Sequence, residues 1–134
     1  MSSSCTQAWE YPSNEVTTCE LSFTCHTDGS FDTYSINTSE GLVFMALTIP
    51  DADTPPTPLY DIAILDEDGV DIFGGELENR SATAKEQAVP AIGSTFGGRY
   101  FSGILQLAIS GNSVNGGKGK VKLYILNNIN DSRR

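Results

Sequence analysis

Apolar and polar residues alternate with a period of two along much of this chain. In residues 15–26, the side chains of Cys19, Leu21, Phe23 and Cys25 share one parity. Successive side chains of a strand point to opposite faces, so this pattern predicts a strand with one buried face. Similar patterns, and the almost continuously apolar stretch 41–49, predict further strands at 31–37, 41–49, 59–65, 70–73, 100–110 and 120–126.

The number and spacing of these segments define the expected fold. About seven short strands separated by turn signals predict an all-β fold: an antiparallel β-sandwich, jelly-roll or Ig-like, or a small barrel. The connections are too short for helical crossovers, which excludes parallel α/β folds. Helix formers occur together at 81–88, where Thr83 and Glu86 have capping-box spacing. We expect one short helix or an ordered loop there.

The positions of the turn residues predict two β-hairpins within a single domain. Residues 66–69 form an acidic turn that would join strands 59–65 and 70–73. The glycine-rich residues 111–119 would join the last two strands, with Gly103 marking a bulge. We expect an N-terminal arm at 1–14, one sandwich domain at 15–126 and a polar tail at 127–134.

Charge is unevenly distributed along the sequence. The chain has 8 basic and 17 acidic residues, a net charge of −9. Residues 1–79 hold fifteen of the acids and no Lys or Arg, whereas residues 80–134 have a net charge of +6. An acidic protein is a poor partner for nucleic acid or an anionic membrane, and no apolar run reaches the roughly 20 residues of a membrane span. Either the two parts neutralise each other within one chain, or opposite faces of two copies meet.

Cysteine and histidine offer little chemistry. Cys5, Cys19 and Cys25 precede or lie in the first predicted strand, and the first five residues lack the basic and apolar stretches of a secretory signal. We therefore expect free, buried thiols. Cys25 and the single histidine, His26, are adjacent and would point to opposite strand faces. Neither a zinc site nor a Cys/His catalytic pair is complete, so we expect no cofactor and no enzymatic activity.

The acidic segment 66–71 is a candidate calcium site. An EF-hand loop requires Gly at position six and Glu at position twelve, but counting from Asp66 places Gly69 fourth and Leu77 twelfth. A looser site from Asp66, Asp68 and Asp71 remains an alternative. The favoured interpretation is a solvated hairpin turn.

Partner contacts are expected in three segments. Prolines concentrate at 50–58, which predicts an extended loop or arm, and basic side chains occur in the loop 74–90 and near the last strand. The lysines of that strand would line one side, either to protect a sheet edge or to contact an acidic partner. The candidate contact residues are Pro50, Pro55, Pro56, Pro58, Arg80, Lys85, Lys118, Lys120 and Lys122.

Residues 58–75 (PLYDIAILDEDGVDIFGG) and 79–87 (NRSATAKEQ) resemble a segment shared by small proteins of tailed bacteriophages and prophages. The similarity continues through 100–109 and 119–126, so it covers roughly residues 41–126. Members of this family are mostly encoded among virion structural genes. The resemblance implies a virion structural protein that is assembled in the host cytoplasm, and it brings no catalytic motif.

Within that class we expect a capsid decoration (cement) protein that binds the major capsid protein and forms a trimer or ring. A neck or tail component, such as a head–tail connector, is the alternative. A tail-associated host- or carbohydrate-binding module is a further alternative, for which the aromatic residues Trp9, Tyr11 and Phe96 are the candidates.

Overall fold

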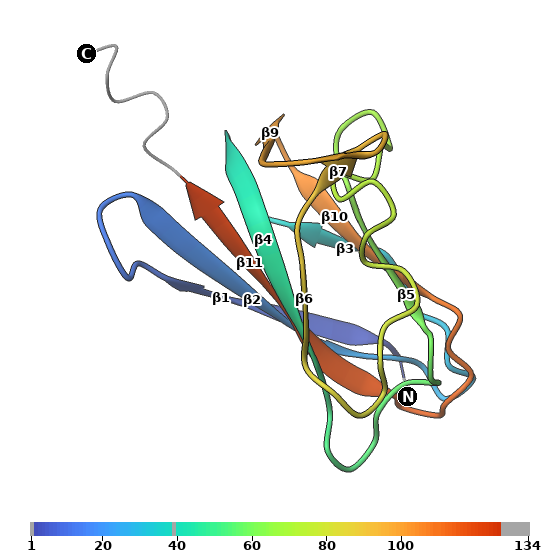
Figure 1. Cartoon of the computed structure of the whole chain (residues 1–134). Coiled ribbons are helices and arrows are strands. Elements are labelled where there is room, and N and C mark those ends of the chain that lie inside the picture. The colour runs from blue at the N-terminus through green and yellow to red at the C-terminus, as the bar shows by residue number, and fades with distance from the viewer. Residues whose placement is uncertain (1, 39, 127–134) are drawn as a thin grey trace.

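The computed structural model describes residues 2–38 and 40–126 as short strands joined by turns and loops (Figure 1). No residue in these two ranges is helical. The strands are β1 (Ser4–Glu10), β2 (Val16–Thr24), β3 (Tyr34–Ile36), β4 (Glu40–Pro50), β5 (Asp61–Leu65), β6 (Glu86–Ala88), β7 (Ala91–Ile92), β8 (Thr95–Phe96), β9 (Arg99–Ser102), β10 (Leu105–Ser110) and β11 (Lys118–Leu126). The tail expected at 127–134 lies outside the described residues.

The strands form two main antiparallel sheets. The larger one has the order β1-β2-β11-β4-β6, and β9 pairs with the part of β4 that β6 leaves unpaired. The smaller one has the order β3-β10-β5, and β7 pairs with β8 in a separate hairpin. The two main sheets lie as separate layers in Figure 1, and neither closes on itself. The chain is therefore an all-β antiparallel sandwich, as the sequence predicted, and the small barrel is not formed.

The core lies between the two layers and follows the period-two pattern. In β2 and β11 every second side chain faces inward and is almost completely buried. Burying a Leu, Ile or Phe side chain stabilises the fold by about 1.5–3 kcal/mol, so this shared inner face is the main source of stability. The inner residues of the larger sheet include Cys19, Leu21, Phe23, Val121, Leu123 and Ile125, and those of the smaller sheet include Ile36, Ile62, Ile64, Leu105, Leu107 and Ile109.

The expected strand 100–110 is divided between the two sheets. β9 belongs to the larger sheet and β10 to the smaller one. The break falls at Gly103, whose φ of +82° is unfavourable for other residues. β10 and β11 are consequently not a hairpin, because residues 111–117 carry the chain back to the larger sheet, where β11 lies between β2 and β4. Alternation defines which side of a strand is buried but not which neighbour it pairs with, so the sequence could not show this.

The hairpin expected at 59–73 forms only at its turn. After β5, Asp66 accepts the backbone N–H groups of Asp68 and Val70. The return strand is reduced to an isolated bridge between Leu65 and Asp71, after which the chain continues through turns. The cause is Asp71, which accepts three backbone N–H groups and thereby stabilises a turn in place of a ladder.

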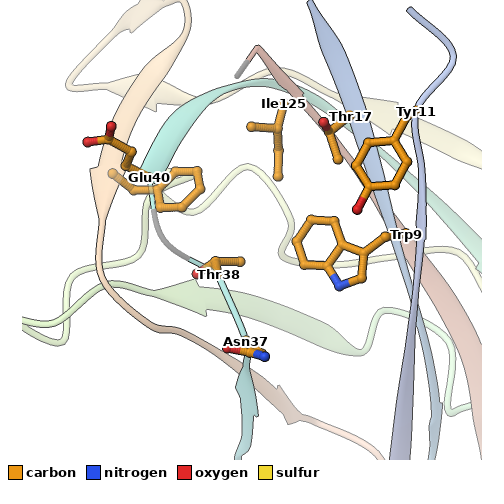
Figure 2. A pocket seen from close by; sticks show the side chains of 8 residues that line it. Trp9, Tyr11, Thr17, Asn37, Thr38, Glu40 and Ile125 are labelled. Atoms are coloured by element: carbon orange, nitrogen blue, oxygen red, sulfur yellow. The ribbon is translucent and has the colours of Figure 1, made fainter. Parts of the chain in front are cut away.

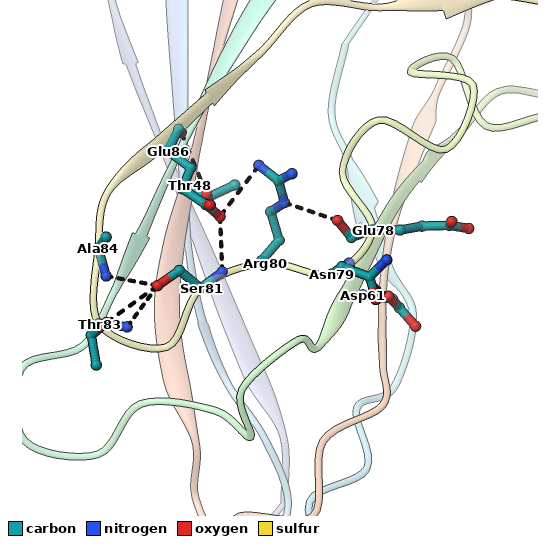
Figure 3. Close-up of polar contacts among 9 residues, drawn as sticks. All are labelled: Thr48, Asp61, Glu78, Asn79, Arg80, Ser81, Thr83, Ala84 and Glu86. Carbon is teal, nitrogen blue, oxygen red and sulfur yellow. Dashed lines mark hydrogen bonds and ion pairs between the residues drawn. The ribbon is translucent and has the colours of Figure 1, made fainter.

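Residues 81–88 form no helix. Of the two alternatives predicted from the sequence, a short helix or an ordered loop, the structure has the ordered loop. Ser81 Oγ accepts the N–H groups of Thr83 and Ala84 at 3.1 and 2.9 Å (Figure 3). Glu86 Oε1 accepts the N–H of Ser81 at 2.8 Å. The capping interactions thus begin at Ser81, and β6 follows immediately. The segment has no apolar stripe to hold a helix against the core.

The segment expected as an N-terminal arm is a strand of the sandwich. β1 pairs with β2 along its whole length and forms the outer edge of the larger sheet. Gln7 connects it to the other layer, because Oε1 accepts the Tyr34 hydroxyl at 2.9 Å and the Asn37 backbone N–H at 3.1 Å. Residues 4–10 are therefore part of the domain.

Candidate functional site

A groove of about 420 Å³ crosses the end of the larger sheet where β11 begins. Its apolar lining comes from the end of β4 and the following loop, and includes Ile49, Pro50 and Ala52. Lys118 and Lys120 of β11 and Lys85 of the loop before β6 also line it. We call this feature the lysine groove. It brings together four of the contact residues predicted from sequence, although they come from three separate segments.

The positive charge of the lysine groove is only partly balanced. Within residues 2–38 and 40–126, neither Lys85 nor Lys118 forms an ion pair, and Lys120 Nζ lies 3.5 Å from Glu20 Oε1 in an exposed pair of small energetic value. Of the described residues that line the groove, only Asp51 has a carboxylate. Its pKa is held below the usual value by the N–H of Thr54, then by that of Asp53, with a smaller effect of Lys118.

Lys122 lies on the same outer face, further along β11. Its Nζ is 5.4 Å from the centre of the Tyr124 ring, and that ring is 6.1 Å from the ring of Phe44. β11 is a central strand, so the idea that its lysines protect a sheet edge is wrong. The alternative, a contact strip for an acidic partner, stays a prediction.

The proline segment is a packed loop. Asn112 Oδ1 accepts the backbone N–H of Thr57 at 2.8 Å, and Thr54 O accepts the N–H of Lys118 at 2.9 Å. Pro50 ends β4, Pro56 is buried, Pro55 is half-buried and Pro58 is exposed. The segment thus does not extend as an arm, and among its prolines only Pro50 lines the lysine groove.

Arg80 makes internal contacts. Its side chain is 13% exposed, with Nη1 3.6 Å from Glu86 Oε1, and Nε donates to the carbonyl of Glu78 (Figure 3). Its backbone pairs with Tyr60, which is fully buried. Arg80 therefore joins the loop 74–90 to the core and is poorly placed to contact a partner, contrary to the expectation from sequence.

The three candidate calcium ligands do not converge. Asp66 accepts hydrogen bonds from backbone N–H groups and from Arg99. Asp71 accepts hydrogen bonds from backbone N–H groups only, and the side chain of Asp68 is exposed. The N–H of Val70, followed by that of Asp68 and by Arg99, lowers the pKa of Asp66. In the part of the chain that the structure describes, no three His, Cys, Asp or Glu side chains form a group that could hold a metal ion.

The cysteines are free, and Cys19 and Cys25 are fully buried. Burial raises the pKa of Cys19 to about 12 and that of the half-buried Cys5 to about 11, which disfavours the reactive thiolate. His26 accepts the Ser3 N–H at Nδ1, and its Nε2 lies 3.0 Å from Asp32 Oδ2. Cys25 and His26 therefore point apart, as predicted.

A second cavity, of about 410 Å³, lies at the other end of the larger sheet (Figure 2). We call it the aromatic cleft. Trp9 and Tyr11 stand next to each other on one side of it, and Asn37 and Thr38 lie across from them. Glu40 is at the margin, where its carboxylate points away and accepts the Tyr100 hydroxyl at 3.2 Å. The remaining lining residues are Thr17, Phe101 and Ile125.

The sequence drew attention to only part of this cleft. Trp9 and Tyr11 were among the three aromatic candidates, whereas the third, Phe96, is on β8 and does not line the cleft. Asn37 and Thr38 were missed. They reach the cleft through long-range contacts with Gln7 and Gly103, for which the sequence carries no local signal.

Comparisons with protein-family models, curated proteins and solved structures found no match. Among the described residues there is no helix long and apolar enough to cross a membrane. The lysine groove and the aromatic cleft are therefore assigned on their geometry and chemistry.

Proposed function

We propose that this protein is a bacteriophage virion structural protein, a capsid decoration (cement) protein that stabilises the head by surface contacts. The lysine groove is the observation that carries this proposal. A chain with a net charge of −9 places three lysines from two segments around one apolar groove. The resemblance of residues 41–126 to phage proteins supplies the biological setting.

The groove has the composition of a protein contact site. Ile49, Pro50 and Ala52 supply apolar surface to bury, and the surrounding ammonium groups select an acidic partner. The apolar contact continues over the outer face of the larger sheet, where Phe44, Leu47 and Tyr124 are half-exposed. The partner is an acidic patch on the major capsid protein. Because the attraction is electrostatic, the association should weaken with salt.

The second copy of the chain is a further acidic partner. Residues 1–79 carry fifteen acids and no Lys or Arg, so the lysine groove of one copy can accept this part of the next copy. Contacts of this head-to-tail kind generate a ring when the rotation between successive copies closes. This is the observation that favours the alternative of a neck or tail component, in which such a ring would occupy one vertex.

Electron cryomicroscopy of assembled particles tests the two candidates. Density for the protein on every capsomer supports a decoration protein. A single ring at one vertex contradicts it and supports the neck component, and absence of the protein from particles contradicts both.

The double variant Lys118→Glu/Lys120→Glu tests the lysine groove itself. Added to heads that lack the protein, it should bind about tenfold or more weakly than the wild type, because two attractive contacts become repulsive. The single variant Lys122→Glu reverses a charge on the same face, beside Tyr124 but outside the groove lining, and should weaken binding less than the double variant. Equal binding of the double variant and the wild type would refute the assignment of the groove.

A further inference from the structure

We propose that the aromatic cleft is a binding site for a neutral saccharide, independently of what the lysine groove binds. The cleft combines two adjacent aromatic side chains, Trp9 and Tyr11, with the uncharged polar side chains of Asn37, Thr38 and Thr17. Sugar rings present apolar C–H faces that stack on aromatic rings, and hydroxyl groups that need donors and acceptors. Its volume of about 410 Å³ is within the range of small-ligand pockets.

The two aromatic side chains of the cleft differ in how far solvent reaches them. Tyr11 is 71% exposed, and Trp9 beside it is half-buried on the inner side of β1, opposite Cys19. The Trp9 ring borders the cleft in Figure 2. Its Nε1 is not among the buried side-chain atoms that lack a hydrogen-bond partner, and the ring is only half-buried, so a molecule in the cleft can reach the indole N–H. A ligand hydroxyl could therefore accept a hydrogen bond from this group.

The polar side of the cleft is held in place by the fold. Gln7 Oε1 accepts the backbone N–H of Asn37 at 3.1 Å, and Thr38 Oγ1 donates to the carbonyl of Gly103 at 2.8 Å. Both bonds leave the Asn37 side-chain amide uncommitted within the described part of the chain. This amide can donate and accept, which suits a sugar hydroxyl. Because residues 37 and 38 are fixed beforehand, binding costs little ordering entropy.

The charge of the cleft selects against acidic sugars. Among the described residues, Glu40 carries the one carboxylate of the lining, and this group points away from the cleft and accepts the Tyr100 hydroxyl. The described residues of the lining include no Lys or Arg to neutralise an anion, and the chain has a net charge of −9. Sialylated, sulfated or phosphorylated glycans are therefore disfavoured relative to neutral ones.

Trp9 is the single tryptophan of the chain, so its fluorescence reports directly on the cleft. The purified full chain is titrated with a panel of neutral oligosaccharides (glucose, galactose, mannose and N-acetylglucosamine oligomers) and with sulfated counterparts. We expect a saturable change in emission with at least one neutral member and a weaker response to its sulfated form. No saturable response to any neutral saccharide would overturn the proposal.

Two variants test the assignment without disturbing the core. Tyr11→Ala and Asn37→Ala change exposed side chains and should each weaken saccharide binding by about tenfold. Phe96→Ala, which changes a similarly exposed aromatic side chain outside the cleft, should leave the affinity unchanged. Unchanged binding in Tyr11→Ala, or a response to a proline-rich peptide in place of any saccharide, would show that the cleft has another role.

Discussion

Arg99 and Asp66 form an ion pair that joins the two layers of the sandwich. Arg99 Nη2 lies 3.0 Å from Asp66 Oδ2, and both side chains are largely buried, with 25% and 13% of their surfaces exposed. Arg99 begins β9 of the larger sheet, whereas Asp66 directly follows β5 of the smaller one. The same carboxylate also holds the turn after β5 through its bonds to Asp68 and Val70. One side chain therefore stabilises both a local turn and the contact between the sheets.

Replacement of Asp66 should lower stability in a pH-dependent way. The pKa of Asp66 is lower in the folded than in the unfolded protein, so its contribution is present above the unfolded value of about 4 and is lost as the pH falls through the folded value. Asp66→Asn should reduce the free energy of unfolding by about 1–2 kcal/mol at pH 7. Urea denaturation at pH 7 and pH 3 measures this.

The matched control is Asp68→Asn, which changes an exposed carboxylate in the same turn. It should alter the free energy of unfolding by less than about 0.5 kcal/mol. If Asp66→Asn destabilised the protein equally at both pH values, or no more than Asp68→Asn, the Arg99–Asp66 link would not have the role assigned to it.

Substitution of two glycines can distinguish the free-energy cost of a positive φ from the cost of a steric clash. Gly93 and Gly74 have φ values of +64° and +62°. A Cβ at Gly93 meets nothing within 4 Å, whereas a Cβ at Gly74 would lie 2.0 Å from the carbonyl oxygen of Ala91. Gly93→Ala should therefore cost about 1–2 kcal/mol, the ordinary cost of this conformation for a residue with a Cβ.

Gly74→Ala should cost clearly more, about 3 kcal/mol or above, because the backbone at Gly74 or at Ala91, the first residue of β7, must also move. Thermal denaturation of both variants provides the comparison. Equal melting temperatures would contradict the close approach of residues 74 and 91. Gly93→Ala serves as the control for the backbone term alone.

The sequence predicted the fold better than it predicted the sites, for a physical reason. Alternation in β2 and β11 reflects one-sided burial, which is a local property, and it defined these strands closely. Pairing is a long-range property, so β11 was assigned to a hairpin although it lies between β2 and β4. The sequence showed the lysines of the groove only as separate charges. Lys85 and Lys118 come to line the same groove because β4 lies between β11 and β6 in the sheet.

Asp71 should be important for stability and not for binding a metal. Its carboxylate accepts the N–H groups of Ile64, Phe73 and Gly75 at 3.3, 3.0 and 2.9 Å. Asp71→Ala leaves these donors unpaired and should cost about 2–3 kcal/mol. Because the same oxygens are occupied, millimolar CaCl2 should leave the melting temperature of the wild type unchanged. A rise in melting temperature on adding CaCl2, reversed by EDTA, would restore the calcium interpretation.

The buried hydroxyl of Tyr60 should contribute nothing to stability. The ring is fully buried, and among the described residues its hydroxyl has no hydrogen-bond partner, while burial raises its pKa to about 12. Tyr60→Phe removes an unsatisfied polar group and should leave the free energy of unfolding unchanged or raise it by up to about 1 kcal/mol. Tyr34→Phe is the control, because it loses the bond to Gln7 and should cost about 1 kcal/mol. A loss of more than about 1 kcal/mol in Tyr60→Phe, measured by urea denaturation, would show that this hydroxyl has a partner.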